Sequence, residues 1–354
     1  SLIDSAVGMR RLIATSSDGT TRSLCLSFRD MDLWPYALEL KVDLLDKREP
    51  KSLILEDKAP FGAENLMGGD IDTLIGELSL FLRDQRARRK IMPPAFETLR
   101  KGLEYGITKA QYGVRLGTTE VVVFRANPYQ YTLAPYLESE DLGWAQAPMT
   151  VRGWLERIPE ASLLLNGGQY YPDRSSMGYL KRDSGELEPR AHKHWKGYVV
   201  SLAKDSGLVP FSVMDLEIPR GTESFDNYHN AFQSFMVIDR LGQMRVKDTD
   251  HVASRVAIGE DNDGYINIVI VKGAITLRDL AYLLNDLEIF PALSLDGGVE
   301  TQIAFQRQGS WEYIYGEYSH NAFGNIRLID YHPSLPLVVA LTPITEPSQD
   351  TNGQ

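Results

Sequence analysis

The pattern of apolar and polar positions is most informative between residues 254 and 301, where it predicts a compact run of elements. Expected there are a strand at 254–259, a second strand at 266–271, a helix opened by Thr276 and reaching 284, and a third strand ending at Leu295. Arg255 lies near the start of the first strand, and Asp296 follows the last one. Both charged side chains are therefore expected at strand ends, where loops commonly carry binding and catalytic residues.

Similar patterns predict strands along most of the remaining chain, separated by turns. They are expected at 11–15, 23–28, 37–44, 120–125, 130–135, 163–165, 198–202, 211–216, 234–239, 305–307, 311–315 and 335–341. Between Asp70 and Pro93 the apolar period changes to that of a helix, and we expect a second helix from Pro94 to Tyr105. Strands and helices in separate runs predict an α+β fold.

The length of 354 residues exceeds what one minimal core needs, so two regions are expected. We predict a small α+β region over 1–117 without assigned chemistry, a larger domain of mixed sheets with packed helices over 118–345, and a polar tail over 346–354. A hydrophobic content of 43% with 24% charged residues is ordinary for a folded protein and excludes a disordered chain.

Charge and cysteine content narrow the classes of partner. The net charge of −11 gives no overall attraction to a polyanion, so we expect no nucleic-acid partner. No apolar run approaches the ~20 residues that cross a bilayer, and the chain starts without a basic and apolar leader. The single Cys25 excludes an intrachain disulfide and a cysteine zinc site, and its alternating surroundings predict a small buried side chain.

Four short motifs follow one another along the chain. They are the segment Leu165-Asn-Gly-Gly-Gln-Tyr-Tyr171, the strand Ser254-Arg-Val-Ala-Ile-Gly259, the helix start Thr276-Leu-Arg-Asp-Leu-Ala281 and the turn Leu295-Asp-Gly-Gly298. In this order they resemble the phosphodiester glycosidase domain family, which includes the enzyme that uncovers mannose 6-phosphate by removing N-acetylglucosamine, and many bacterial exported proteins. The resemblance covers roughly residues 118–343. It implies a carbohydrate or sugar-phosphate ligand, no cofactor, and a periplasmic or secreted location.

The first motif places a polar side chain where the backbone must turn sharply after an apolar strand. From the residues alone a simple tight turn is the favoured interpretation, whereas the resemblance places this segment in a cleft. Tyrosine rings beside amides are suited to hold a sugar, because the ring packs on C–H groups and the amide reads hydroxyls. The resemblance thus implies these substrate-binding candidates: Asn166, Gly167, Gly168, Gln169, Tyr170, Asp173 and Gln233, with Arg174 also at the rim.

Arg255 stands among apolar neighbours, and a buried charge without a partner costs several kcal/mol. One hypothesis is an internal salt bridge with Asp296. The other, favoured by the resemblance, is that its planar guanidinium contacts a phosphate with two hydrogen bonds.

Asp296 precedes Gly297 and Gly298, whose missing side chains let a substrate approach the backbone. Many aspartates before two glycines merely cap turns, so this motif alone leaves both interpretations open. Where the family continues with glycine and serine, this chain has Val299 and Glu300. Asp296, Arg255 and Glu300 are the catalytic candidates, and Glu300 adds a second carboxylate that is able to share acid and base duties. Glu300 is equally consistent with an exposed charge.

Other polar clusters give weaker signals. His192 and His194 share one face of a possible strand, yet a pair without a third ligand does not define a metal site, so we predict no metal. The sequence Asp261-Asn-Asp-Gly264 lacks the distal glutamate of a calcium loop and predicts a hairpin turn.

Three functions remain open. The leading hypothesis is hydrolysis of a sugar-1-phosphodiester or a related cell-envelope glycan. The altered residues Val299 and Glu300 favour a non-catalytic glycan-binding or structural protein, and the added carboxylate favours a hydrolase of neutral glycosides. The sequence names neither the sugar nor the oligomeric state.

Overall fold

The computed structural model describes residues 91–110, 113–141, 149–183, 185–218, 224–246, 251–320 and 326–344, together with four backbone strands within the first 55 residues. The chain divides into two compact units. One comprises residues 1–90 with 111–113, and the other comprises residues 91–110 with 114–354.

The first unit contains a four-stranded antiparallel sheet with the order β3-β2-β1-β4. Its strands are β1 (Met9–Ser16), β2 (Thr21–Phe28), β3 (Leu38–Lys41) and β4 (Pro50–Leu55). The helix expected between Asp70 and Pro93 falls mostly on residues outside the described ones, as does the tail at 346–354, and Cys25 is described by its backbone alone.

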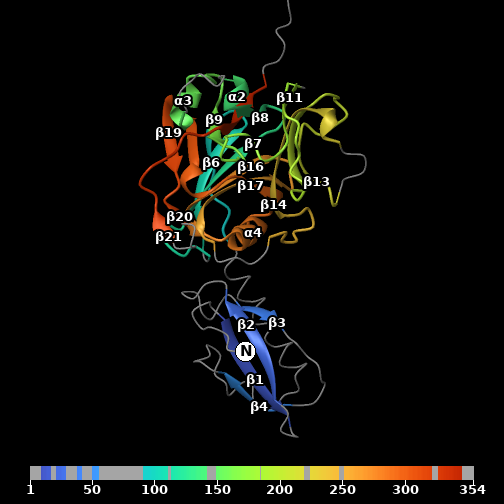
Figure 1. Ribbon diagram of the computed structural model, residues 1–354, viewed down its shortest axis with the longest axis vertical. Coiled ribbons are helices and arrows are strands. Elements are labelled where there is room, and N and C mark those ends of the chain that lie inside the picture. Colours follow the sequence, from blue (N-terminus) through green and yellow to red (C-terminus); the bar gives the residue numbers. More distant parts are fainter. Residues whose placement is uncertain are drawn as a thin grey trace, which may run out of the picture. The chain divides into compact units, whose positions relative to one another are not determined.

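Two antiparallel sheets form the described part of the second unit (Figure 1). The larger has the order β11-β10-β14-β17-β15-β16-β7-β6-β5, in which β12 also pairs with β14 and β13 pairs with β12, and the smaller has the order β19-β18-β9-β22-β8. The strands are β5 (Glu97–Arg100), β6 (Leu103–Lys109), β7 (Glu120–Ala126), β8 (Tyr131–Leu137), β9 (Leu163–Asn166), β10 (Leu180–Arg182), β11 (Gly185–Glu188), β12 (Gly197–Ala203), β13 (Phe211–Asp215), β14 (Tyr228–Ile238), β15 (Ala253–Asp261), β16 (Ile266–Ile275), β17 (Ile289–Ser294), β18 (Gln302–Arg307), β19 (Ser310–Tyr315) and β22 (Leu337–Pro343), with β20 (Tyr318–His320) and β21 (Ile326–Leu328) forming a separate ribbon.

Helices are few and short in the described residues. They are α2 (Glu138–Asp141), α3 (Val151–Leu155) and α4 (Leu277–Asp286), with single 3-10 turns η4 (Phe225–Asn227) and η5 (Gly298–Glu300). Thr276 opens α4 as expected, because its hydroxyl accepts a hydrogen bond from the Asp279 amide at 3.0 Å. The fold is thus sheet-rich, with fewer packed helices than the α+β expectation.

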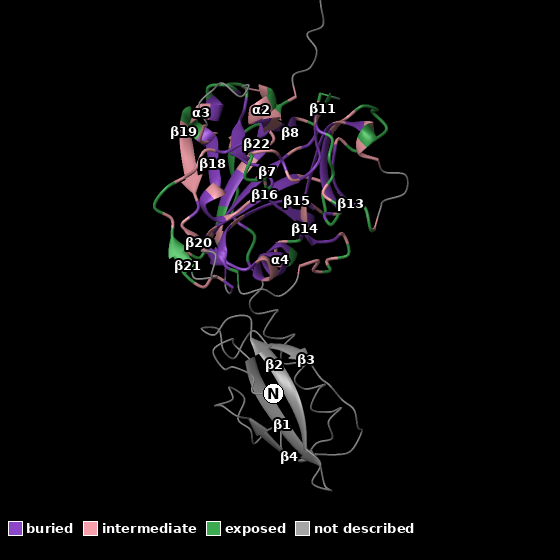
Figure 2. Ribbon diagram, in the orientation of Figure 1, coloured by how far each residue is buried: buried purple, intermediate pink, exposed green. Residues whose placement is uncertain are grey.

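The main core lies between the two sheets (Figure 2). Alternate residues of each strand point into it, so Phe124 and Ile258 of the large sheet meet Leu165 and Val339 of the small one. The opposite face of the large sheet is covered by α4, and the outer face of the small sheet by α3. Both sheets are therefore packed on both faces, and loops at their strand ends are where binding residues are expected.

One expectation for the region before 118 is wrong. Residues 94–105 form no helix: β5 and β6 make a hairpin whose turn contains Gly102 at φ +75°, and β6 pairs with β7 along its whole length. Strand pairing with the large sheet overrides the apolar spacing that suggested a helix. Both strands belong to the second unit, which comprises residues 91–110 and 114–354. Among the described residues, no helix is long and apolar enough to cross a membrane.

Candidate active site

The ends of β9 and β17 meet although they are far apart in the sequence. The Asn166 side-chain amide donates to the Asp296 carbonyl at 2.8 Å, and the Asp296 amide donates to the Gly167 carbonyl at 3.1 Å. The Asn166 side-chain oxygen in turn accepts from the Gln302 amide at 3.4 Å. These hydrogen bonds of the Asn166 side chain join the two turns. Asn166 is also buried, which leaves it no exposed surface for a sugar.

Three glycines have backbones packed against neighbours at this junction. A Cβ at Gly167 would lie 2.3 Å from the Leu337 side chain, and one at Gly297 would lie 2.7 Å from the Ser254 carbonyl. Gly298 has φ +71°, and a Cβ there would lie 2.6 Å from the Ser319 hydroxyl. The missing side chains therefore leave room for close neighbours, which are side chains at Gly167 and Gly298 and a backbone carbonyl at Gly297. Gly168 differs, because a Cβ there would make only ordinary van der Waals contacts, at 3.6 Å or more.

Arg255 lies beside the Asp296 turn. A Cβ at Gly297 would be 3.3 Å from the Arg255 Nη1 atom, which puts the guanidinium against the backbone that follows Asp296. Arg255 Nη2 donates to the His251 carbonyl at 3.0 Å, and its Nε donates to the Ile275 carbonyl at 3.4 Å. Burial lowers the Arg255 pKa to about 10, and the charge of Asp296 acts in the opposite direction. At that pKa the guanidinium is charged at neutral pH.

Asp296 and Arg255 form no salt bridge among the described side chains, so the hypothesis of an internal ion pair is not supported. Burial, followed by the neighbouring Glu300, raises the pKa of Asp296 to about 7, although the Gly297 amide donates to its Oδ1 at 2.9 Å and Arg255 is near. A carboxyl group that titrates near neutrality can both accept and release a proton at physiological pH.

Glu300 lies on η5, and its charge acts on the carboxyl group of Asp296. Burial raises its pKa, and the Tyr170 hydroxyl donates to its Oε1 at 3.2 Å. The pKa of Tyr170 is also raised, first by burial and then by the charges of Glu300 and Asp296, so its hydroxyl stays protonated and acts as a donor. Glu300 is partly buried and is therefore not simply an exposed charge.

Of the remaining candidates from the sequence, Gln169 and Asp173 are exposed, and Gln233 is buried in a structural role. Gln169 and Asp173 are exposed, and Asp173 accepts hydrogen bonds from the amide and hydroxyl of Ser175. Gln233 is buried, and its side-chain amide is fully used: it donates to the carbonyls of His192 and Trp195 and accepts from the His192 amide at 2.6 Å. Gln233 thereby fixes the 192–195 loop, and its contact with a sugar stays a prediction.

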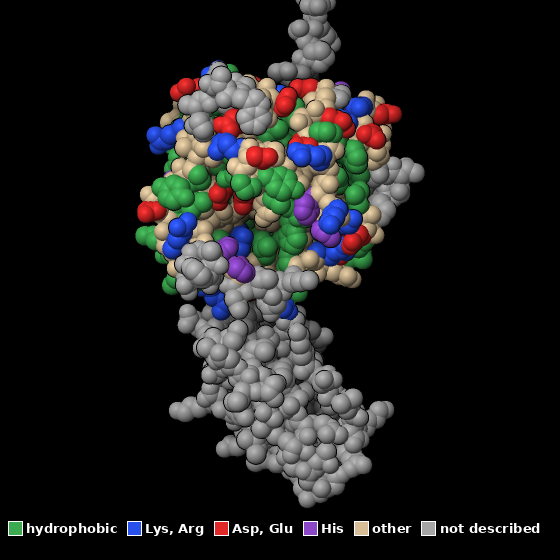
Figure 3. Space-filling model, in the orientation of Figure 1, with side chains coloured by type: hydrophobic (Ala, Val, Ile, Leu, Met, Phe, Trp, Pro, Cys, Tyr) green, Lys and Arg blue, Asp and Glu red, His purple; other side chains and the backbone are tan. Residues whose placement is uncertain are grey.

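Sequence reasoning missed a group of basic side chains beside Arg255. His251 and His320 have ring centroids 4.6 Å apart in an edge-to-face arrangement, and the charge of Arg327 acts on both His320 and Glu300. No motif marks these residues, since only the pairing of β20 and β21 and the packing of β20 on η5 and β15 bring them near. Figure 3 shows a hollowed face where acidic, basic and histidine side chains gather.

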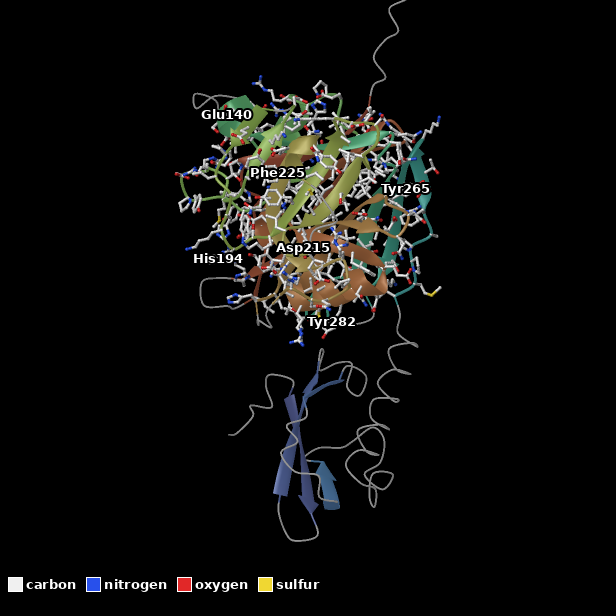
Figure 4. All side chains as sticks on the ribbon, turned by 90° about the vertical axis from the view of Figure 1, so that its right-hand side faces the viewer. Glu140, His194, Asp215, Phe225, Tyr265 and Tyr282 are labelled. Carbon is white, nitrogen blue, oxygen red and sulfur yellow. The ribbon has the colours of Figure 1, made fainter. Side chains whose placement is uncertain are left out.

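The other polar clusters form no metal site in the described part of the chain, where no group of three or more His, Cys, Asp or Glu side chains is suitably placed. Asp261 starts the predicted hairpin turn, which Tyr265 marks in Figure 4, and both Asp261 and Asp263 pair with Arg125 at 2.8 and 2.7 Å. A cavity of about 190 Å³ lies beside this turn, at the opposite end of β15 from Arg255.

Residues 160–327 match the sequence model of the phosphodiester glycosidase family. The resemblance expected from the four motifs is confirmed over this stretch, which begins later and ends earlier than the 118–343 expected. It contains Asn166, Arg255 and Asp296. Comparison with curated protein sequences gives no match.

Several solved structures are similar to this chain. The catalytic domain of zebrafish N-acetylglucosamine-1-phosphodiester alpha-N-acetylglucosaminidase, auto-inhibited by its pro-peptide, has 13% identity and a TM-score of 0.47, covering 71% of this chain and 87% of that one. A hypothetical protein from Synechocystis has 15% identity and a TM-score of 0.49, covering 72% and 64%. A protein from Burkholderia pseudomallei that is described as exported has 12% identity and a TM-score of 0.37, covering 64% of this chain and 75% of that one.

Proposed function

We propose that this protein is a glycosidase that cleaves the bond between a sugar and a phosphodiester group. The observation that carries the proposal is a carboxyl group, Asp296, whose pKa is raised to about 7 next to the charged Arg255, within the stretch that matches the phosphodiester glycosidase family. A group with this pKa is suited to general acid and base catalysis at neutral pH. The family resemblance also supports a periplasmic or secreted place of action, as part of the same proposal.

The phosphate leaving group of the proposed reaction needs no proton from a general acid, because it leaves as a stable anion. A water oxygen forms a bond to the anomeric carbon, the bond from that carbon to the phosphate oxygen breaks, and the electron pair remains on the phosphate. Asp296 takes the proton from water, and Arg255 neutralises the charge of the departing phosphomonoester. Glu300, held by Tyr170, supports the positive charge that develops on the sugar ring.

A second candidate function is hydrolysis of a neutral glycoside. The observation that favours it is Glu300, a partly buried carboxyl with a raised pKa close to Asp296. Two carboxyl groups of this kind can divide acid and base roles, which an uncharged leaving group requires. In that case Glu300 protonates the leaving oxygen, and Arg255 has no anion to contact.

An assay with two substrate series distinguishes these candidates. Sugar-1-(p-nitrophenyl) phosphodiesters should release a reducing sugar together with p-nitrophenyl phosphate, while p-nitrophenyl glycosides should release p-nitrophenol slowly or not at all. Hydrolysis in ¹⁸O-labelled water should place the label on the sugar. Label on the phosphate, or preference for neutral glycosides, would refute the proposed bond. Absence of turnover with every sugar in both series would favour a non-catalytic glycan-binding protein.

Asp296→Asn should lower phosphodiester turnover at least 100-fold, because it removes the proton acceptor. Asp330→Asn, which changes an exposed aspartate in the same unit, is the matched control and should leave turnover unchanged. Equal activity of both variants would show that Asp296 has no chemical role.

A further inference from the structure

The cavity beside the 261–264 hairpin takes no part in the proposed reaction. It has a volume of about 190 Å³ and lies at the opposite end of β15 from Arg255, next to the hairpin that Tyr265 marks in Figure 4. Pockets that hold drug-sized ligands have about 300–1,000 Å³. This cavity is therefore of a size for one extended side chain or one small molecule.

Several elements build the cavity, and all of them belong to the second unit. Val123 and Arg125 of β7 and Asn267 of β16 line it from the large sheet. Arg125 pairs directly with Asn267, so their side chains share one face of the sheet, and Val123 places this face on the side that α4 covers. The turn from α4 into β17, the hairpin and the segment before β5 supply the rest of the lining.

The apolar part of the lining is suited to an alkyl chain. It consists of Pro93, Pro94, Phe96, Val123, Leu287 and Ile289. Phe96 is 38% exposed, so its ring still has surface for a ligand to cover. An alkyl chain in contact with these groups would remove apolar surface of both partners from water.

Arg125 is the one basic residue in this lining, and its donors already have partners. Its Nε donates to the Asp261 carboxylate at 2.8 Å and its Nη2 to the Asp263 carboxylate at 2.7 Å, while Glu104 lies 3.7 Å from its Nη1. The guanidinium also stacks on Tyr265, 3.8 Å from the ring centroid. Arg125 is therefore held by the protein and is not available to an anionic ligand.

Asn267 supplies an open acceptor to the cavity. Its side chain is 2% exposed, and its Nδ2 donates to the Tyr265 carbonyl at 3.1 Å. Its Oδ1 accepts no hydrogen bond from the described residues, and it is not sealed from solvent as the ring nitrogens of His192 and His320 are. A nearly buried acceptor without a protein donor calls for a donor from a molecule in the cavity.

The charge of the lining selects the kind of donor. Asp261, Asp263 and Glu288 line the cavity with Arg125, which leaves a net charge of −2. The C-terminal end of α4 adds partial negative charge through the turn at Leu287, since its last turn holds no basic residue. Anions are therefore repelled. A divalent metal ion is also disfavoured, because Arg125 stands among the carboxylates and no group of three or more suitable ligands occurs in the described part of the chain.

We propose that this cavity binds an alkylammonium group, the chemistry shared by a lysine side chain and a free aliphatic amine. The three donors of the ammonium match three acceptors, the Asn267 oxygen and the carboxylates of Asp263 and Glu288. The carbon chain packs on Phe96 and the other apolar groups. The cavity contains none of the proposed catalytic residues, so the inference does not depend on the proposed reaction.

Ligand-observed NMR titration of the full chain tests this site. n-Pentylamine should bind, and its affinity should fall with rising salt because Asp263 and Glu288 are exposed. n-Pentanol, which has the same length and no charge, should bind about 10-fold more weakly or worse. Nα-acetyl-lysine methylamide distinguishes the two sources: tighter binding than that of pentylamine assigns the occupant to a polypeptide, and weaker binding assigns it to a free amine.

Variants locate the binding. Glu288→Gln and Asn267→Leu should each weaken pentylamine binding by about 10-fold, the loss of one hydrogen bond to a charged group. Glu288 is exposed, so its variant keeps the test valid if the change at the buried Asn267 prevents folding. Glu140→Gln, at an exposed glutamate that Figure 4 shows away from Tyr265, is the matched control and should bind as the wild type does. Turnover of a sugar phosphodiester should be the same in all three variants.

Three results would overturn the proposal. Equal affinity of the wild type, Glu288→Gln and Glu140→Gln for pentylamine would mean that the amine only associates with the surface of a chain of net charge −11. Equal binding of pentanol and pentylamine would show that the charge of the lining selects nothing. Binding of methyl glucoside that Asn267→Leu abolishes, without binding of the amine, would make the cavity a sugar site.

Discussion

Replacing Asp296 by asparagine should stabilise the protein at alkaline pH while abolishing its proposed chemistry. Burial and Glu300 raise the pKa of Asp296 from its ordinary value of 3.8 to about 7 in the folded state. The folded protein therefore holds a proton that the unfolded chain releases, so stability is highest below pH 4 and is lost as the pH rises through 7. Asparagine keeps the shape and carries no charge.

The magnitude follows from the difference between the two pKa values. One pH unit is worth about 1.4 kcal/mol, which sets a ceiling of about 4 kcal/mol for the gain from Asp296→Asn above pH 7. Asp296 is partly exposed, and water screens its charge, so we expect about 2 kcal/mol. For a unit of this size the gain corresponds to roughly 4–8 °C in melting temperature.

The assay is thermal unfolding of wild type and variant from pH 4 to pH 8.5. The difference between them should be near zero at pH 4, grow with pH and level off above 7. Asp330→Asn, an exposed control, should show no such dependence. If Asp296→Asn instead lowered stability at pH 8, the carboxylate would be held by an ion pair with Arg255, and the reasoning from burial would be refuted.

Gly298→Ala should cost more stability than Gly309→Ala, since both glycines have positive φ but only a Cβ at Gly298 would meet another atom, the Ser319 hydroxyl at 2.6 Å. We expect about 1–2 kcal/mol for the control and more for Gly298→Ala in denaturant unfolding, and equal losses would contradict the packing argument. Arg255→Gln should remain folded and lower phosphodiester turnover about 100-fold or more while affecting a neutral glycoside much less, as measured by kcat/KM; a severe melting loss with equal effects on both substrates would mean a structural role. A chain lacking residues 1–90 should fold and bind phenyl phosphate like the full chain, whereas lost binding in a folded product would show that the first unit contributes to the site.

Local patterns determined the element order of the second unit and the motifs of its site. The segment from Ser254 to Asp296 follows the predicted order of two strands, a capped helix and a third strand, because apolar spacing and the Thr276 cap act over a few residues. The same local reasoning failed at 94–105, where pairing with β7 decides the structure.

Only the tertiary structure decided what each site residue contacts. Asn166 and Gln233 both carry side-chain amides. Each amide donates a hydrogen bond to a backbone carbonyl far away in the sequence, and so holds the backbone in place. His320 and Arg327 carry no motif, and the pairing of β20 with β21 together with the packing of β20 on η5 and β15 brings them to the site. The sequence determined that charged groups would stand at strand ends, because alternation is local. Their pKa values and partners depend on burial and on side chains from other elements of the fold, which no local pattern encodes.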